Sequence, residues 1–434
     1  MRGVGGPILR AMPLDSGDTA WVLISAGLVM FMTPGLALFY GGMVRSKNVL
    51  GIMVQNFACI AVVSIVWAVV AYSLAFGPDV GGHGLIGGLD FAMLGNAGDP
   101  VPGLAGLHIP QIAFCAFQLM FAVITAALLT GSGADRLSFR GFLVFATVWT
   151  VLVYAPLAHW VFSPEGWLAQ RGVLDFAGGN VVEIDSGASG LALALVLRPR
   201  RGWPKEAMPP HNLPLTMIGA GILWFGWFGF NAGSALAANG IAAHALMTTH
   251  LAACAGLVSW LVVERRRTGN ATTLGAASGA VCGLVAITPA AGFVPVWASI
   301  LIGLVGGVAG VLAVGMKFRF GYDDSLDVVA VHGVCGVLGT LAIGLVAATS
   351  VNDAVTHEGL FLGGGLHQLG VQGLAVVVSI AWAFTLTYVI ARVVRAAVGL
   401  RVSDQQEVEG IDTTIHAETA YEFGVVSGSG RIGL

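Results

Sequence analysis

The chain has 434 residues, of which 56% are hydrophobic and only 10% are charged. In an ordinary soluble protein about a quarter of the residues are charged. This composition therefore excludes that class and favours a helical membrane protein. The formal net charge of −3 and the lack of a basic tract give no indication of nucleic-acid binding.

Apolar runs long enough to cross a bilayer recur along the whole chain. They predict an all-α polytopic protein with eleven transmembrane helices, at 19–44, 48–76, 109–134, 139–163, 179–198, 212–237, 240–264, 272–289, 293–316, 326–349 and 366–399. Residues 1–18 lack the apolar core of a signal peptide, so we expect them to form a short extracytoplasmic segment. The five cysteines lie inside apolar runs without metal-binding spacing, which favours buried thiols over disulfides. No metal, cofactor or enzyme active site is expected.

Basic residues in the loops predict the orientation of these spans. Seventeen of the 20 Lys and Arg residues fall on one side of the predicted membrane, and Arg2, Arg10 and Arg171 fall on the other. Because positively charged loops stay in the cytoplasm, we expect the N-terminus outside and the C-terminus inside. The predicted domains are therefore a transmembrane unit, 19–399, in the cytoplasmic membrane and a cytoplasmic tail, 400–434.

An internal repeat relates the two halves of the predicted bundle. The stretch "ISAGLVMFMTPGLALFYGG" in the first span resembles "IGAGILWFGWFGFNAGS" in the sixth. Asp175, Glu183 and Gly190 in the fifth span have the same spacing as Asp324, His332 and Gly339 in the tenth, respectively. Five spans separate the members of each pair, so the repeats, 19–198 and 212–349, have opposite orientations, and 366–399 is a final helix. Inverted repeats of this kind are typical of transporters, whose sites lie near the membrane midplane.

Carboxyl groups inside a predicted span are costly and usually functional. At a helical rise of 1.5 Å per residue, the eight positions from Asp175 to Glu183 place Glu183 about 12 Å deeper than Asp175. Glu183 and His332 then approach the membrane centre from opposite faces and are predicted to meet there. Asp185, two residues beyond Glu183, should face a different neighbour and has no assigned role.

Several stretches together resemble the ammonium transporter family, the Amt/Mep/Rh superfamily, and within it the Amt/Mep branch. They are "TPGLALFYGGMVRSKN", "FQLMFAVIT", "LDFAGGNVV", "GWFGFNAGS", "DDSLDVVAVHGVCG" and "EGIDTTIHAETAY". The resemblance implies a homotrimer in the lipid bilayer, with an ammonium or ammonia pore in each subunit. It also implies regulation of the tail by a PII-type signal protein.

Carried over residue by residue, the resemblance implies a gate made of Phe121 and Phe230 and a proton relay made of Glu183 and His332. The implied recruitment site comprises Phe117, Phe121, Phe162, Trp227, Ser234 and Asp175. The implied regulatory tail residues are Gly410, Asp412, His416, Glu418 and Tyr421, and Arg401 and Glu418 are candidate docking charges.

Three positions depart from the family pattern. Glu183 replaces the first histidine of the pore pair, Phe162 replaces a tryptophan of the recruitment site, and Ala417 replaces a glycine of the tail. An alanine lacks the freedom of glycine to take positive φ, so the tail is expected to differ in conformation there.

The predicted function is ammonium transport: capture of the cation at aromatic rings, loss of a proton, and passage of ammonia through an apolar pore. Two alternatives remain. One is an ammonium sensor or receptor, which the short tail disfavours because it leaves no room for a kinase or cyclase. The other is an Rh-like channel for ammonia or carbon dioxide, which the Amt-like tail disfavours.

Overall fold

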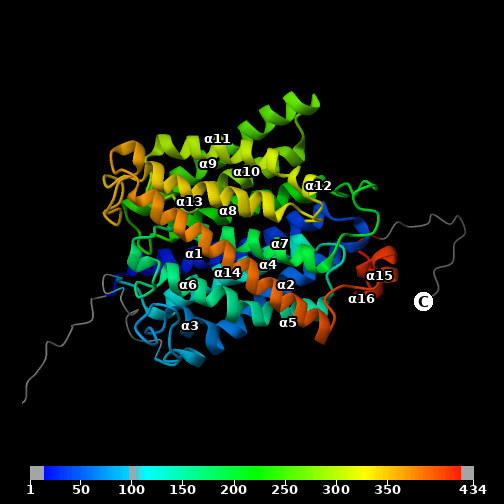
Figure 1. Cartoon of the computed structure of the whole chain (residues 1–434), viewed down its shortest axis with the longest axis horizontal. Helices are drawn as coiled ribbons and strands as arrows, with labels where there is room; N and C mark the ends of the chain where they lie inside the picture. Colours follow the sequence, from blue (N-terminus) through cyan, green and yellow to red (C-terminus); the bar gives the residue numbers. More distant parts are fainter. Residues whose placement is uncertain (1–13, 97–103, 105–106, 422–434) are drawn as a thin grey trace, which may run out of the picture.

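The computed structural model describes residues 14–96, 104 and 107–421, which form helices and loops without a β-strand. The helices lie side by side in one bundle, as Figure 1 shows. Two short helices, α15 (Asp404–Glu409) and α16 (Ile411–His416), lie at one end of the bundle, which is the predicted inner end. Residues 1–13 of the predicted N-terminal segment and residues 422–434 of the predicted tail lie outside the described residues.

The first half of the bundle contains five spans. Two of them continue through a π-helical turn, and the fifth begins with one. The elements are α1 (Ser16–Met43), η1 (Ser46–Asn48), α2 (Val49–Val66), η2 (Trp67–Ala71), α3 (Tyr72–Phe76), η3 (Ala92–Leu94), α4 (Gln111–Gly133), α5 (Phe139–Trp149), η4 (Thr150–Tyr154), α6 (Ala155–Phe162), η5 (Ala169–Arg171), η6 (Gly179–Ile184) and α7 (Asp185–Leu197).

The second half repeats this order of spans, and one more long helix follows it. Its tenth span also begins with a π-helical turn. The elements are α8 (Leu213–Gly233), α9 (Gly240–Thr268), α10 (Thr273–Ile287), α11 (Val296–Ala313), α12 (Met316–Phe320), η7 (Val329–Val334), α13 (Cys335–Val346), η8 (Leu360–Leu362) and α14 (His367–Ala397).

Ten of the predicted spans correspond to helices in the described residues that are long and apolar enough to cross a membrane. The prediction at 272–289 corresponds to α10, an apolar helix of 15 residues. Its helical part is shorter than the roughly 20 residues that usually cross the hydrocarbon core. The all-α membrane architecture is therefore confirmed, whereas the count of eleven spans and their orientation remain predictions.

Polar side chains fix where several of these helices begin. The side chains of Asp15, Ser138, Asn212, Asn239 and Thr272 each accept a hydrogen bond from a backbone N–H in the first turn of the following helix. Those N–H groups have no partner within their own helix, so each cap stabilises its helix by about 1 kcal/mol. The loops thus determine the boundaries that hydropathy alone leaves uncertain.

The two repeated segments pack against each other, because α1 and α8 are neighbours over most of their length. Glycines permit this close approach: a Cβ on Gly219 would come within 2.3 Å of the backbone nitrogen of Phe39. A Cβ on Gly42 would come within 2.3 Å of Thr216 Oγ1. Membrane helices have no hydrophobic drive to associate, so small residues that bring their backbones together carry much of the packing.

The cysteines agree with their predicted role. Cys59, Cys115, Cys282 and Cys335 are buried, Cys254 is partly buried, and all five are free thiols.

A network of ion pairs joins the loops at the predicted inner end. The carboxylate of Asp323 accepts hydrogen bonds from Arg200 Nε at 2.9 Å and Nη2 at 2.8 Å, and Arg136 Nη1 lies 3.9 Å away. Asp135 binds both Arg200 and Arg45, at 3.2 and 3.1 Å. Burial raises the pKa of Asp323, but the bonds from Arg200 and the charges of Arg136 and Arg200 outweigh burial and lower that pKa overall.

Candidate functional site

Aromatic side chains from α4, α6 and α8 meet near the predicted outer end. The rings of Phe121 and Phe230 stack, with centroids 4.2 Å apart and planes 19° from parallel. Phe117 and Phe162 meet the edge or face of Phe121 at 4.9 and 6.5 Å, and Trp227 lies 5.6 Å from Phe230. The structure thus brings together all five aromatic residues that the sequence assigns to the recruitment site and gate.

Two polar groups on α8 accompany this aromatic cluster. Ser234 Oγ donates a hydrogen bond to the carbonyl of Phe230 at 2.8 Å, which leaves its lone pairs as acceptors. Trp227 Nε1 donates to Thr288 Oγ1 at 2.8 Å, and this bond fixes the orientation of the indole. Ser234 is partly exposed, so its oxygen is accessible to a small cation at the cluster.

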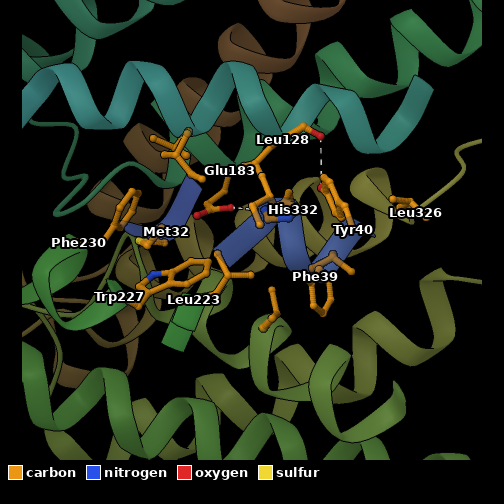
Figure 2. A pocket seen from close by; sticks show the side chains of 15 residues that line it. Met32, Phe39, Tyr40, Leu128, Glu183, Leu223, Trp227, Phe230, Leu326 and His332 are labelled. Carbon is orange, nitrogen blue, oxygen red and sulfur yellow. Dashed lines mark hydrogen bonds and ion pairs between the residues drawn. The ribbon is translucent and has the colours of Figure 1, made fainter. Parts of the chain in front are cut away.

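A narrow cavity extends from Phe230, one of the two stacked rings, into the bundle (Figure 2). Its volume is about 20 Å³, which is room for a molecule the size of water. Figure 2 shows Phe230 and Trp227 toward one end, Glu183 and His332 in the middle, and Tyr40 and Leu326 toward the other end. Most of the lining is aliphatic or aromatic, and it comes from α1, α4, α8, α10 and the two π-helical turns.

Glu183 and His332 form a hydrogen-bonded pair in this cavity. Glu183 Oε2 lies 2.7 Å from His332 Nδ1, and both side chains are buried. Within the described residues, His332 Nε2 has no protein partner. When Nδ1 carries the proton it donates to the carboxylate, and Nε2 is then free to accept a proton from the cavity.

The pair can take up a proton without leaving an unpaired charge. A proton that binds Nε2 forms an imidazolium beside the carboxylate, and transfer of the Nδ1 proton to Glu183 then leaves two neutral groups. Before uptake the pair carries the single negative charge of Glu183, and a buried ion without a counter-charge costs several kcal/mol, so proton uptake relieves that cost.

Each partner of the pair sits in a π-helical turn that an aspartate caps. Glu183 lies in η6, where the carboxylate of Asp175 accepts the N–H groups of Gly178, Gly179 and Asn180 at 2.6 to 2.8 Å. His332 lies in η7, where Asp324 Oδ2 accepts the N–H of Val329 at 2.8 Å. The equal spacing in the sequence thus corresponds to an aspartate-capped π-helical turn in both repeats. π-Helical turns are rare and are often found at functional sites.

One part of the sequence argument is wrong. Asp175 precedes the helix instead of lying within it, because the span begins at Gly179. The assumed helical rise of eight residues between Asp175 and Glu183 therefore does not apply. With three N–H bonds on its carboxylate, Asp175 orders the start of η6, and no direct contact joins it to the aromatic rings among the interactions of the described residues.

Other lining residues were not anticipated from the sequence. Tyr40 lines the cavity beyond His332, and its hydroxyl donates to the carbonyl of Leu128 at 3.3 Å. The further lining residues are Met32, Leu36, Phe39, Ile124, Leu128, Val182, Leu223, Val281, Leu326 and Val331. The internal repeat could have indicated the lining residues of α1. They lie in the stretch of the first span that resembles the segment containing Trp227 and Phe230.

The tail folds against the predicted inner end. The carboxylate of Asp412 accepts the N–H groups of Leu50 and Gly51 at 3.0 and 2.8 Å, at the start of α2. The Tyr421 hydroxyl bonds His211 Nε2 at 2.9 Å and Asn212 Nδ2 at 3.2 Å. The centroid of the His416 ring lies 5.4 Å from that of Phe139. Gly410, between the two short tail helices, has a positive φ of 115°.

The two candidate docking charges differ in their surroundings. Arg401 binds the carbonyls of Leu197 and Pro199 and the carboxylate of Glu407, the last at 2.7 Å. Its guanidinium is therefore used within the chain, whereas the Glu418 side chain is exposed. Ala417 takes φ 56° at the end of α16 despite being an alanine, so a backbone shape that favours glycine persists without one.

Known proteins resemble the chain over nearly its full length. The model of the Ammonium Transporter Family matches residues 20–421. An ammonium transporter of Mycobacterium tuberculosis (strain ATCC 25618 / H37Rv) is 48% identical, with 96% of this chain and 92% of that protein aligned. An ammonium transporter of Bacillus subtilis (strain 168) is also 48% identical, with 94% of this chain and 99% of that protein aligned.

Solved structures share the same fold. The crystal structure of Saccharomyces cerevisiae Mep2 superposes with a TM-score of 0.84 at 36% identity, covering 93% of this chain and 91% of that chain. A structure described as a sensor Amt protein superposes with a TM-score of 0.82 at 30% identity, covering 91% and 97%.

Proposed function

Because the chain belongs to the ammonium transporter family, we propose that it transports ammonium across the membrane by stripping and returning a proton. The cation is captured at the aromatic cluster, loses a proton, and crosses the cavity as ammonia past Glu183 and His332. The observation that carries this proposal is the buried Glu183–His332 pair, which lies in a mostly apolar cavity whose lining includes Phe230, the ring that stacks on Phe121.

Capture at the cluster follows from the chemistry of its rings. A cation against an aromatic face gains about 0.5–2 kcal/mol, depending on how far it is desolvated. Phe121, Phe162 and Trp227 offer such faces, and Ser234 offers an oxygen that accepts an N–H bond. These contacts favour a small, weakly hydrated cation that can also donate hydrogen bonds.

Selectivity arises beyond the cluster. Ammonium and potassium ions resemble each other in size and charge, so aromatic faces alone discriminate poorly between them. The apolar cavity excludes any bare cation because of its desolvation cost. Ammonium avoids this barrier by leaving its proton with the pair, whereas potassium has no proton to lose.

We further propose the membrane orientation, assembly and regulation that accompany this function. The N-terminus lies outside and the C-terminus in the cytoplasm of a cell whose cytoplasmic membrane holds a homotrimer. The docked tail, 400–421, transmits binding of a PII-type protein through Asp412 to the start of α2. Deletion of residues 402–434 should then alter activity or abolish PII binding, and no change in either would refute this regulatory proposal.

The curated relatives identical at 40–48% are named ammonium transporters, or putatively so, which favours transport over sensing. The glutamate at position 183 distinguishes the proton-stripping mechanism from a simple gas channel. A gas channel needs no titratable group in the cavity, so its flux would be independent of Glu183.

The test is electrical. Purified protein in proteoliposomes on a solid-supported membrane should give a current on an ammonium pulse and none on a potassium pulse. Glu183→Gln keeps size but cannot titrate, and it should lower the ammonium current at least about tenfold or admit potassium, since a general acid–base group contributes 10²–10⁴-fold. Glu183→His should restore transport with a shifted pH optimum and stricter exclusion of potassium. Wild-type rate, pH profile and selectivity in Glu183→Gln would make the carboxylate structural.

A further inference from the structure

Asp185 is a buried carboxyl group that the proposed transport cycle does not use. It is the first residue of α7, directly after the π-helical turn that carries Glu183, and it is fully buried. Its carboxylate bonds Ser189, whereas that of Glu183 bonds His332, so the two acids face different neighbours. No ion pair involves it within the described residues. A buried carboxyl group in a membrane helix is costly and calls for a compensating role.

Hydrogen bonds connect Asp185 to two neighbouring helices. Ser189 Oγ donates to Asp185 Oδ1 at 3.1 Å and lies 2.7 Å from Thr387 Oγ1 of α14. Trp149 Nε1 of α5 donates to Thr387 Oγ1 at 2.9 Å and to Ser189 Oγ at 3.1 Å. All four side chains are buried. The indole of Trp149 can only donate a hydrogen bond. The Thr387 hydroxyl can therefore donate to Ser189, and Ser189 donates to Asp185.

The position of this network matters for the segment that carries Glu183. A π-helical turn is less favourable than an α-helical one. Contacts at both ends of η6 are therefore needed to keep it in a single orientation about its helix axis. Asp175 caps its beginning through three N–H groups. Asp185 follows its last residue and accepts the bond from Ser189, which in turn bonds Thr387 of α14 and Trp149 of α5. Glu183 lies between these two anchors.

The second repeat has no such polar anchor. The residues that correspond to Asp185 and Ser189 are Val334 and Leu338, two and six residues after His332, and both are partly exposed and apolar. The helix that supplies Thr387, α14, follows both repeats and has no counterpart within them. The polar network is thus present in only one repeat, and this is the repeat that carries the acid, Glu183, of the pair.

We propose that Asp185 is a positioning residue for Glu183. Through Ser189, Thr387 and Trp149 it fixes the rotation of η6 and α7 so that the Glu183 carboxylate faces His332. The side chain acts as a hydrogen-bond acceptor at a fixed place, and its charge is not required. This inference rests on the proposed role of Glu183 in handling the proton.

The test removes the anchor without touching the cavity. Thr387→Val and the double change Ser189→Ala/Thr387→Val keep the side-chain volume close to that of the native residues. A misplacement of about 1 Å can cost about 100-fold in rate, so we expect the double variant to lower the ammonium current at least about threefold. The pH profile of the current should also shift. Asp185→Asn, which keeps the acceptor oxygen, should retain the native profile.

Thr385→Val is the matched control, because Thr385 lies on the same helix and is exposed. It should leave current and pH profile unchanged. A double variant whose thermal stability falls while its current per folded protein and pH profile stay native would overturn the positioning role. So would Asp185→Asn if it shifts the profile, since charge would then be the active property.

A combination with Glu183→Gln separates the two proposals. If Glu183→Gln behaves as predicted and the anchor acts through Glu183, adding Ser189→Ala/Thr387→Val should cause no further shift of the pH profile. A further shift of the same size would show that the network acts elsewhere. If Glu183→Gln itself is native in all respects, the proton-handling proposal fails independently of the result at Asp185.

Discussion

Gly187 of α7 lies against Gly333, the residue that follows His332, so closely that an added Cβ would come within 2.2 Å of Gly333 Cα. The reciprocal contact involves Gly336 of α13, where a Cβ would come within 2.8 Å of Glu183 Cβ. Gly187 and Gly336 each lie four residues after the titratable residue of their own helix. The distance between the two partners of the pair is therefore set by the absence of two side chains.

Gly187→Ala should separate Glu183 from His332, because the added methyl group meets rigid backbone instead of a flexible side chain. We expect the ammonium current to fall at least about tenfold, and overpacking of this kind destabilises the fold by about 1–3 kcal/mol. Current per folded protein and thermal unfolding in detergent measure the two effects. The control is Gly221→Ala, where an added Cβ would meet nothing within 4 Å. Native currents in Gly187→Ala would mean that the crossing does not set the geometry of the pair.

The phenyl gate predicts different results for its two rings. Phe230 lines the cavity directly, so Phe230→Ala should widen it and admit water and potassium. Phe121 stacks on Phe230 and also contacts Phe117 and Phe162, so Phe121→Ala should mainly weaken ammonium capture. Ammonium and potassium currents over a range of concentrations distinguish loss of selectivity from loss of affinity. If neither variant changes flux or selectivity, the rings serve packing alone.

Orientation is open to a direct chemical measurement. A cysteine placed in residues 77–108, of which 97–103 and 105–106 lie outside the described residues, should react with an impermeant maleimide added outside intact cells. One placed in residues 199–210 should react only after the cells are opened. The partly buried Cys254 is first replaced by alanine so that background labelling stays low. The reverse pattern would contradict the inverted arrangement inferred from the positive charges.

The ion-pair network at the predicted inner end makes stability depend on acidic pH. The pKa of Asp323 is lowered in the folded protein, so its contribution to stability is complete above the unfolded value of about 3.9 and is lost as pH falls through the lower folded value. Asp323→Asn should destabilise the fold at neutral pH by about 3–5 kcal/mol, because buried Arg136 loses its counter-charge and Arg200 keeps only Asp135. Thermal unfolding between pH 3 and pH 7 should show a steeper acid limb in the native protein than in the variant. Parallel curves would exclude Asp323 as the source.

The tail offers a test of backbone strain. Ala417 has φ 56°, and left-handed backbone costs a residue other than glycine about 1–2 kcal/mol. Ala417→Gly should therefore stabilise the docked tail by about 1 kcal/mol, which is about a fivefold increase in amide protection over 404–416. Ala420→Gly, at a residue without positive φ, should bring no such increase. Equal or lower protection in Ala417→Gly would show that neighbouring contacts impose no strain at this position.

The sequence predicted the helical architecture and the residues of the site better than their local geometry. Hydropathy suffices for ten of the spans, because a span needs only a long apolar run. The pairing of Glu183 with His332 was predictable from equal spacing in two inverted halves. The π-helical turns were not, since their stability comes from the caps at Asp175 and Asp324 and from tertiary contacts. The hydroxyl of Tyr40 and the glycine crossing were missed for the same reason: apolar periodicity does not say which face of a helix lines a cavity.

The bonds from Asp412 to Leu50 and Gly51 join residues 362 and 361 positions apart in the chain. During synthesis these two N–H groups at the start of α2 therefore lack this acceptor until residue 412 has been made. A chain that stops before residue 412 lacks both hydrogen bonds, and water must take the place of the carboxylate at these N–H groups. The start of the second membrane helix is therefore completed only by a residue from the tail.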